Sequence, residues 1–196
     1  MKGKIALLDY FDGKEAAALL IDGELHDFFA EPGANAPGSI FKVKVKHQIK
    51  GSGGIFVESP DGDFFLHKTK GITSGDVILV QVSSYGDREK LPRVTTKLLF
   101  KSRYVIVTPF NEGLNIAKNI QDNERRIQLK QLVVEGLDHI PYGMIMRSSC
   151  ASANKSEIIS DCKNTIMTAQ NVLSAEDKQM GLIHRAPSPH QLAWRE

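Results

Sequence analysis

The stretch that decides the fold runs from residue 37 to residue 68 and reads PGSIFKVKVKHQIKGSGGIFVESPDGDFFLHK. It opens as a strand in which basic and apolar residues alternate. Its basic residues are Lys42, Lys44 and Lys46. Because successive side chains of a strand point to opposite faces, the ammonium groups share one face and the apolar side chains share the other. No acidic residue interrupts the basic face before Glu58.

Two further short strands are predicted at residues 54–58 and 63–67, joined by a turn at Pro60-Asp61-Gly62. They carry Phe56 and Phe65. Lysines beside aromatic rings on a small sheet provide charge for phosphates and flat surfaces for bases, as single-stranded nucleic acid requires. The alternative is that both rings fill the core of a barrel, and the pattern alone does not choose between the two.

Composition sets wide limits. A chain of 196 residues suits one large domain or two small ones, and a net charge of +2 does not by itself indicate nucleic acid. Cys150 and Cys162 form no CxxC motif and are expected to be reduced thiols. The first residues resemble neither a signal peptide nor a membrane span, so the expected location is the cytoplasm, with no membrane partner.

The predicted elements indicate an α+β protein. Strands at 4–10, 16–21 and 25–29 are linked by turns at Gly13 and Asp22-Gly23. Five short strands follow, and their close spacing fits a five-stranded OB-type barrel. They span residues 40–46, 54–58, 63–67, 76–82 and 93–98.

The second half changes character after residue 100. A strand at 104–108 precedes a helix that Asp122 caps and that ends near Gly136, with an apolar side at Ile127, Leu132 and Val134. A strand at 143–147 then delivers Arg147 and Ser148 to its end. Asn154 and Glu157 have capping-box spacing and begin a helix in which apolar residues recur every three to four positions.

Three segments together resemble the amino-terminal half of the ribonuclease E/G family of bacterial endoribonucleases. The first contains FKVKVKH, GGIFVE and DFFLHK, the second contains LLFKSRYVIVTP and GLNIAKNIQDNERR, and the third is GMIMRSS. The resemblance implies an OB-fold RNA-binding barrel inserted in an incomplete ribonuclease H-like subdomain and followed by an α/β sensor of RNA 5′ ends. The implied boundaries are 1–36 and 187–196 for the ribonuclease H-like part, 37–100 for the barrel and 101–186 for the sensor.

The resemblance also implies roles for particular residues. Phe56, Phe65 and Lys90 match positions where the family's barrel contacts RNA, and Arg147 and Ser148 match the residues that hold a 5′-monophosphate. Ser148 stands where the family commonly has threonine, which keeps the hydroxyl donor. An arginine fork binds phosphate through two parallel hydrogen bonds. The alternative for Arg147 is a surface ion pair with Asp161 or Glu157.

No catalytic residues are expected in this chain. Family catalysis uses carboxylates that hold Mg²⁺ on a later strand, and no such motif occurs here. Asp61 and Asp63 have the spacing of a metal pair, but a turn explains them better. The sequence therefore predicts no metal or cofactor site, with Mg²⁺ implied only for the full-length family, and leaves the chain's own status as an enzyme open.

Two functions of different class follow. The chain is either the RNA-binding, 5′-monophosphate-sensing half of an endoribonuclease of RNA processing or decay, inactive alone, or a stand-alone RNA-binding module. A barrel that binds an acidic protein partner ranks last. Because one incomplete sheet buries little, residues 1–36 are expected to pack poorly or to pair with another copy of the chain in a homo-oligomer.

Overall fold

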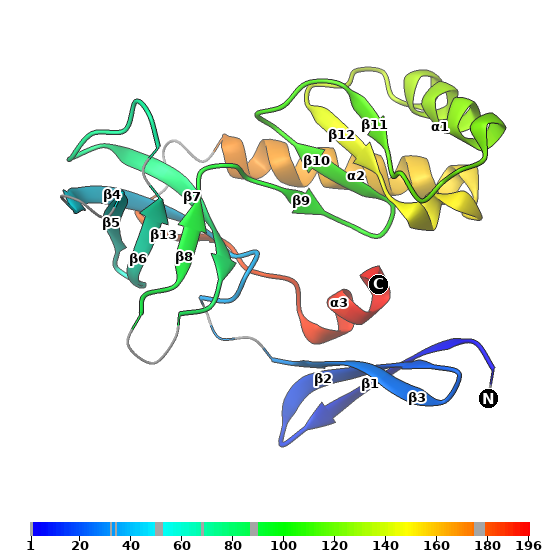
Figure 1. The fold of residues 1–196 in the computed structure, drawn as a ribbon, viewed down its shortest axis with the longest axis horizontal. Coiled ribbons are helices and arrows are strands. Elements are labelled where there is room, and N and C mark those ends of the chain that lie inside the picture. Colours follow the sequence, from blue (N-terminus) through cyan, green and yellow to red (C-terminus); the bar gives the residue numbers. More distant parts are fainter. Residues whose placement is uncertain are drawn as a thin grey trace. The chain divides into compact units, whose positions relative to one another are not determined.

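The computed structural model describes residues 2–31, 33, 35–49, 53–67, 69–86, 90–174 and 179–196. The chain forms two compact units (Figure 1). One contains Met1–Thr96 together with Gln179–Glu196, and the other contains Lys97–Lys178. No helix in the described part of the chain is long and apolar enough to cross a membrane.

The first unit begins with an antiparallel three-stranded sheet. Its strands are β1 (Lys4–Phe11), β2 (Lys14–Ile21) and β3 (Glu24–Ala30). Asp12 and Gly13 have φ values of 53° and 76°, and Asp22 and Gly23 have 52° and 91°. Positive φ at both turn residues matches the twist of the strands on either side, which confirms the predicted hairpins.

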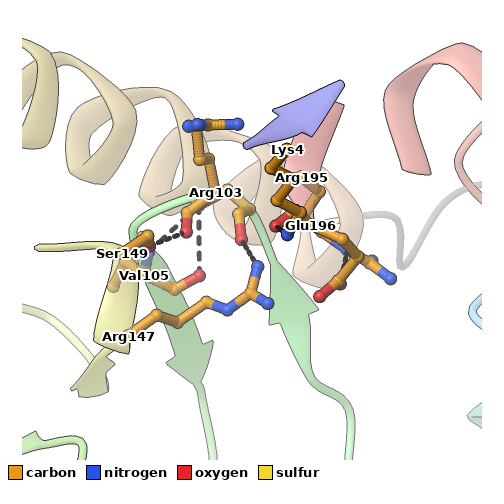
Figure 2. A network of polar contacts seen from close by, with 8 residues as sticks. Lys4, Arg103, Val105, Arg147, Ser149, Arg195 and Glu196 are labelled. Atoms are coloured by element: carbon orange, nitrogen blue, oxygen red, sulfur yellow. Dashed lines mark hydrogen bonds and ion pairs between the residues drawn. The ribbon is translucent and has the colours of Figure 1, made fainter. Parts of the chain in front are cut away.

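The helix α3 (Pro189–Arg195) packs on this sheet, mainly against β2. Ser188 and Gln191 form a capping box at its start. The ring of His190 lies 5.7 Å from the ring of Tyr10. At its other end Lys4 donates to the carbonyl of Glu196 (Figure 2). The strands of the barrel are therefore inserted in the sequence between two elements that pack together.

A closed five-stranded barrel occupies most of the remaining first unit, as predicted. The strand order is β4-β5-β6-β8-β7, and β7 pairs back with β4 to close the barrel. The strands are β4 (Ile40–Ile49), β5 (Gly54–Ser59), β6 (Gly62–His67), β7 (Val77–Ser84) and β8 (Arg93–Thr95). A further strand, β13 (Gly181–His184), pairs with β4, although residues up to 186 were expected in the sensor region.

Alternation along the strands separates the barrel core from its surface. Phe41 and Phe64 are fully buried, with ring centroids 4.8 Å apart. Aliphatic side chains from all five strands complete the core: Val43, Val45, Ile55, Val57, Leu66, Val80, Val82 and Val94. The apolar face predicted for β4 therefore points inward, and the lysines alternate with it.

The second unit pairs a four-stranded sheet with two helices. The strand order is β11-β12-β10-β9, with only β11 and β12 parallel. The elements are β9 (Phe100–Lys101), β10 (Val105–Thr108), β11 (Leu114–Ile116), α1 (Asn123–Gly136), β12 (Gly143–Met146), a 3₁₀ turn at Ser148–Ala151 and α2 (Lys155–Leu173). Helix α2 packs against β10 and β9.

Helix α1 buries a different side from the one predicted. Asp122 caps it by accepting from the amides of Glu124 and Arg125, as expected. Its buried residues, however, are Leu129 and Val133, whereas the predicted Ile127 and Val134 are 58% and 64% exposed.

The start of α2 also differs in detail from the prediction. The side chain of Asn154 makes no capping hydrogen bond to the helix backbone, and its amide lies 3.4 Å from the Glu157 carboxylate. The predicted apolar repeat of α2 is correct, because Ile158, Cys162, Ile166 and Ala169 are all buried.

Candidate nucleic-acid interface

Phe56 and Phe65 lie on the outer side of the barrel. They are direct partners across β5 and β6, and each is half-buried, unlike the fully buried Phe41 and Phe64. Their ring centroids are 6.4 Å apart in an edge-to-face arrangement. The second interpretation of the sequence, in which both rings fill the barrel core, is therefore wrong.

Two histidine rings continue this pair. The ring of His47 lies 5.2 Å from Phe56, and the ring of His67 lies 5.4 Å from Phe65. Both histidines are exposed. Neither contact was predicted from the sequence, although the i, i+2 spacing of Phe65 and His67 on one strand places both side chains on the same face.

The three lysines of β4 differ in their surroundings. Lys42 is half-buried, whereas Lys44 and Lys46 are exposed. Lys46 forms an ion pair with Glu58 at 2.5 Å, and the hydrogen bond and charge of that carboxylate raise the pKa of Lys46. Because Glu58 offsets one of the three charges, the basic face is weaker than the alternation predicted.

Lys90 is exposed in the connection between β7 and β8. The carbonyl of Lys90 lies against the backbone of Gly86, where an added Cβ would be 2.0 Å from it, so the two ends of this loop meet. The neighbouring residues 87–89, which include the basic Arg88, lie outside the described residues.

In the second unit, Arg147 follows β12 and lies beside the turn between β9 and β10. Its guanidinium donates to the carbonyl of Ser102 at 2.6 Å (Figure 2). Its backbone N–H donates to the carbonyl of Tyr104 at 2.8 Å. Ser148 is exposed at the first position of the 3₁₀ turn, and Ser149 donates to the carbonyl of Arg103 at 2.5 Å. Arg147 and Ser148 are therefore adjacent on a segment that several bonds hold in place.

The carboxylates considered as alternative partners of Arg147 accept hydrogen bonds from the same turn. Asp161 accepts from the hydroxyl of Ser102 at 2.5 Å and from the amide of Tyr104 at 2.8 Å, and Glu157 accepts from the Tyr104 hydroxyl at 2.9 Å. Both carboxylates lie on α2, so they tie this helix to the turn that contacts Arg147. No local sequence pattern predicts such contacts, because they join residues more than fifty positions apart in the sequence.

Arg125 of α1 holds the other side of the Arg147 segment. Its guanidinium donates to the carbonyl of Cys150 at 2.6 and 3.1 Å and to the carbonyl of Ala153 at 2.9 Å. These charge-assisted bonds occupy backbone acceptors at the end of the 3₁₀ turn. Arg125 thus positions the segment that carries Ser148, a role that was not predicted from the sequence.

The two cysteines have no sign of chemical reactivity. Both are buried and free, and burial raises the pKa of Cys150 to about 11 and that of Cys162 to about 12. A thiol is a nucleophile or metal ligand only as thiolate, which these values disfavour at neutral pH.

The residues that the structure describes bring no three of histidine, cysteine, aspartate and glutamate together in a group that could hold a metal ion. Asp61 instead accepts a hydrogen bond from the amide of Leu182 at 2.7 Å.

The fold defines an α+β protein built around an OB-type barrel. Residues 100–196 match the model of the ribonuclease E/G family. Curated relatives are ribonuclease G of Haemophilus influenzae, 25% identical over 88% of this chain, and ribonuclease E of a Nostoc species, 22% identical over 75%. A ribonuclease E/G-like protein of Pyropia yezoensis is 29% identical over 47% of the chain.

The match of residues 100–196 and the similarity to these relatives support the assignment of the chain to the ribonuclease E/G family. The matched part of the chain spans 40% of the Haemophilus protein, 24% of the Nostoc protein and 18% of the Pyropia protein.

Proposed function

We propose that this chain is the substrate-recognition part of a ribonuclease E/G-type endoribonuclease of RNA processing or decay in the cytoplasm. The barrel binds single-stranded RNA through Phe56 and Phe65, with Lys42, Lys44, Lys46 and Lys90 supplying charge for phosphates. The segment at Arg147 and Ser148 holds a 5′-monophosphate. The match to a ribonuclease family supports an RNA substrate.

The observation that carries this proposal is the pair of outward-facing rings. An exposed aromatic ring costs free energy in water, and the barrel core is already filled by Phe41, Phe64 and aliphatic side chains. Two half-buried phenylalanines paired across adjacent strands, beside a strand that carries lysines, fit a surface on which bases stack.

The test of the barrel is alanine substitution. Phe56→Ala and Phe65→Ala should each weaken binding of a single-stranded RNA by about 1–3 kcal/mol, because each removes one stacking ring. Phe28→Ala, which removes a phenylalanine that is 57% exposed on the first sheet, is the matched control and should leave RNA binding unchanged. Thermal unfolding separates this outcome from a packing role. Phe64→Ala should cost about 3–5 kcal/mol of stability, and similar losses in both ring variants would make them core residues and contradict the proposal.

The 5′-end site is tested separately, through Arg147. Arg147→Ala should abolish any preference for a 5′-monophosphate over a 5′-hydroxyl end, while binding of the RNA body by the barrel survives. Arg147→Lys keeps the charge but loses the planar fork, so it should restore only part of the preference. Affinities for two oligonucleotides that differ only at the 5′ end measure this, and an unchanged preference in Arg147→Ala would remove Arg147 from the site.

Binding without cleavage is the expected behaviour of this chain with 5′-monophosphorylated RNA and Mg²⁺. Cleavage would show that it carries catalytic groups of its own.

A stand-alone RNA-binding module is the second candidate function. It is favoured by the closed barrel, in which β7 pairs back with β4. Self-association through the first sheet is a further part of the proposal, and sedimentation over a range of concentrations tests it.

A further inference from the structure

The outer side of the barrel carries four aromatic rings in an unbroken series. We call His47, Phe56, Phe65 and His67 the ring row. Successive centroids lie 5.2, 6.4 and 5.4 Å apart. The row crosses three neighbouring strands, β4, β5 and β6, and all four side chains are half-buried or exposed.

His47 reaches this face because β4 contains a bulge. Val45 pairs with Val57 and Gln48 pairs with Ile55, so Lys46 and His47 both stand opposite Phe56. An extra residue in one strand re-aims the side chains next to it. The bulge therefore places both His47 and Lys46 opposite Phe56. In a regular strand only one residue would lie opposite Phe56.

The other end of the row depends on a glycine. Gly54 pairs with His67, and the Phe65 ring lies over Gly54, where an added Cβ would be 2.2 Å from that ring. His67 is two residues from Phe65 on the same strand and contacts its ring nearly at right angles, at 83°. The position of His47 thus depends on the bulge in β4, and the position of the Phe65 ring that His67 contacts depends on the missing side chain at Gly54.

The charges around the row are mixed. Lys46 and Glu58 form an ion pair on β4 and β5, and Asp63 of β6 adds to the field that Lys46 experiences. Such a mixed surface attracts phosphates only weakly. Stacking is the interaction that every ring of the row can offer to an unpaired base, whichever base it is.

We propose that His47 and His67 are RNA-binding residues and that the barrel grips unpaired RNA with the whole ring row. This inference rests on the proposed function, because it extends the Phe56 and Phe65 surface at both ends. It assigns base stacking to the two histidines, whereas the proposed function assigns it only to Phe56 and Phe65. The ligand is a single-stranded polynucleotide that lays successive bases along the row.

The experiment titrates the full chain with a fluorescent, 5′-hydroxyl ten-nucleotide oligouridylate at pH 7.5, so that the 5′-phosphate site does not contribute. His47→Ala and His67→Ala should each weaken binding about fivefold or more, the lower end of the effect of losing a stacking ring. His47→Phe and His67→Phe should bind at least as tightly as the unsubstituted chain, because they keep the ring. His26→Ala, which removes an exposed histidine of β3, is the matched control and should bind normally.

The possible results distinguish a failure of this inference from a failure of the proposed function. If Phe56→Ala weakens binding while both histidine-to-alanine variants bind normally, the ring row ends at the phenylalanines and the inference is wrong, although the proposed function stands. If His47→Phe and His67→Phe bind as weakly as the histidine-to-alanine variants, the histidines do not act as stacking rings, and the inference is also wrong. If the unsubstituted chain does not bind the oligonucleotide, the proposed function fails first. Circular dichroism of each variant establishes that the fold is retained.

Discussion

Gly54 controls the position of the Phe65 ring. A Cβ at this position would lie 2.2 Å from one ring carbon of Phe65 and 2.4 Å from another. Gly54→Ala should therefore displace the ring, which is the far end of a side chain and can move, while the barrel core stays intact. RNA affinity should fall by about 1–3 kcal/mol, as for loss of the ring itself.

Gly33→Ala is the matched control for that substitution. Gly33 is not in the positive-φ region, and an added Cβ there would have open space around it. Fluorescence anisotropy with labelled RNA measures the affinities, and urea titration measures stability. An affinity in Gly54→Ala equal to that of Gly33→Ala would show that the Phe65 ring does not need its observed position.

The two buried cysteines make stability depend on pH in the alkaline range. Their folded pKa values, about 11 and about 12, lie above the ordinary 9.0. Their contribution is fully present below pH 9, and it is lost as pH rises from 9 towards the folded values, because only the unfolded chain then releases the protons. At pH 10 the loss should be about 1 kcal/mol per thiol.

Urea unfolding at pH 8 and pH 10 measures this loss. Because other groups also titrate in this range, the comparison is with the double variant Cys150→Ala, Cys162→Ala. The double variant should be less stable at pH 8, since it loses buried volume, but should lose less stability between the two pH values. An equal loss in both proteins would show that the thiols are not protected by the fold.

The sequence did not predict those features of single residues that depend on how strands pair. Phe64 and Phe65 are adjacent, so alternation puts them on opposite faces without saying which face is inside. Only the pairing of β5 and β6 within a closed barrel settles that Phe64 points inward. Likewise, the bond from Arg147 to the Ser102 carbonyl joins residues 45 positions apart and has no local signature.

At the scale of elements, β13 is attached to the barrel through a side chain of the β5–β6 hairpin. Asp61 accepts from the amide of Leu182 at 2.7 Å, and Gly181 has a φ of 129°, with its hypothetical Cβ 2.6 Å from the Asp61 carboxylate. Asp61→Ala should therefore release β13 and cost about 1 kcal/mol, as expected for a solvent-exposed hydrogen bond to a charged group. Asp61→Asn keeps an acceptor and should cost less.

Amide hydrogen exchange at Leu182 is the direct measurement for this attachment. Its protection should drop in Asp61→Ala and remain in Asp63→Ala, a change on the same hairpin. If Leu182 exchanges equally slowly in all variants, the pairing of β13 with β4 holds the strand without Asp61.

Periodicity predicted some elements better than others. Helix α2 has one apolar stripe, and that stripe is buried. Helix α1 carries apolar residues on more than one side, so the pattern did not single out Leu129 and Val133. The bulge in β4 was not predicted, because an extra residue in a strand becomes visible only against the register of its partner.

At the scale of the whole molecule, the first sheet has one covered and one uncovered side. Ala17 and Leu19 are buried, and α3 packs on this sheet. Leu7 and Phe28, which pair with Ala18 from either side, are 50% and 57% exposed. The expectation that residues 1–36 pack poorly is thus only partly correct, because α3 covers one side of a three-stranded sheet that is continuous apart from a register shift between β2 and β3. The exposed apolar side is the surface through which self-association is proposed.

We propose that outward rings and lysines of the barrel together bind unpaired RNA. Titration of the chain and of the double variant Phe56→Ala, Phe65→Ala with labelled single-stranded RNA, over a range of salt concentrations, tests it most directly. We expect a complex that weakens with salt, with log K falling by about 0.7 per phosphate contacted for each unit of log salt concentration. The double variant should bind more weakly at every salt concentration but with the same slope, because it loses stacking and keeps charge. If the chain forms no salt-sensitive complex, or if the double variant binds as tightly as the original chain, the barrel does not bind RNA through these rings and lysines.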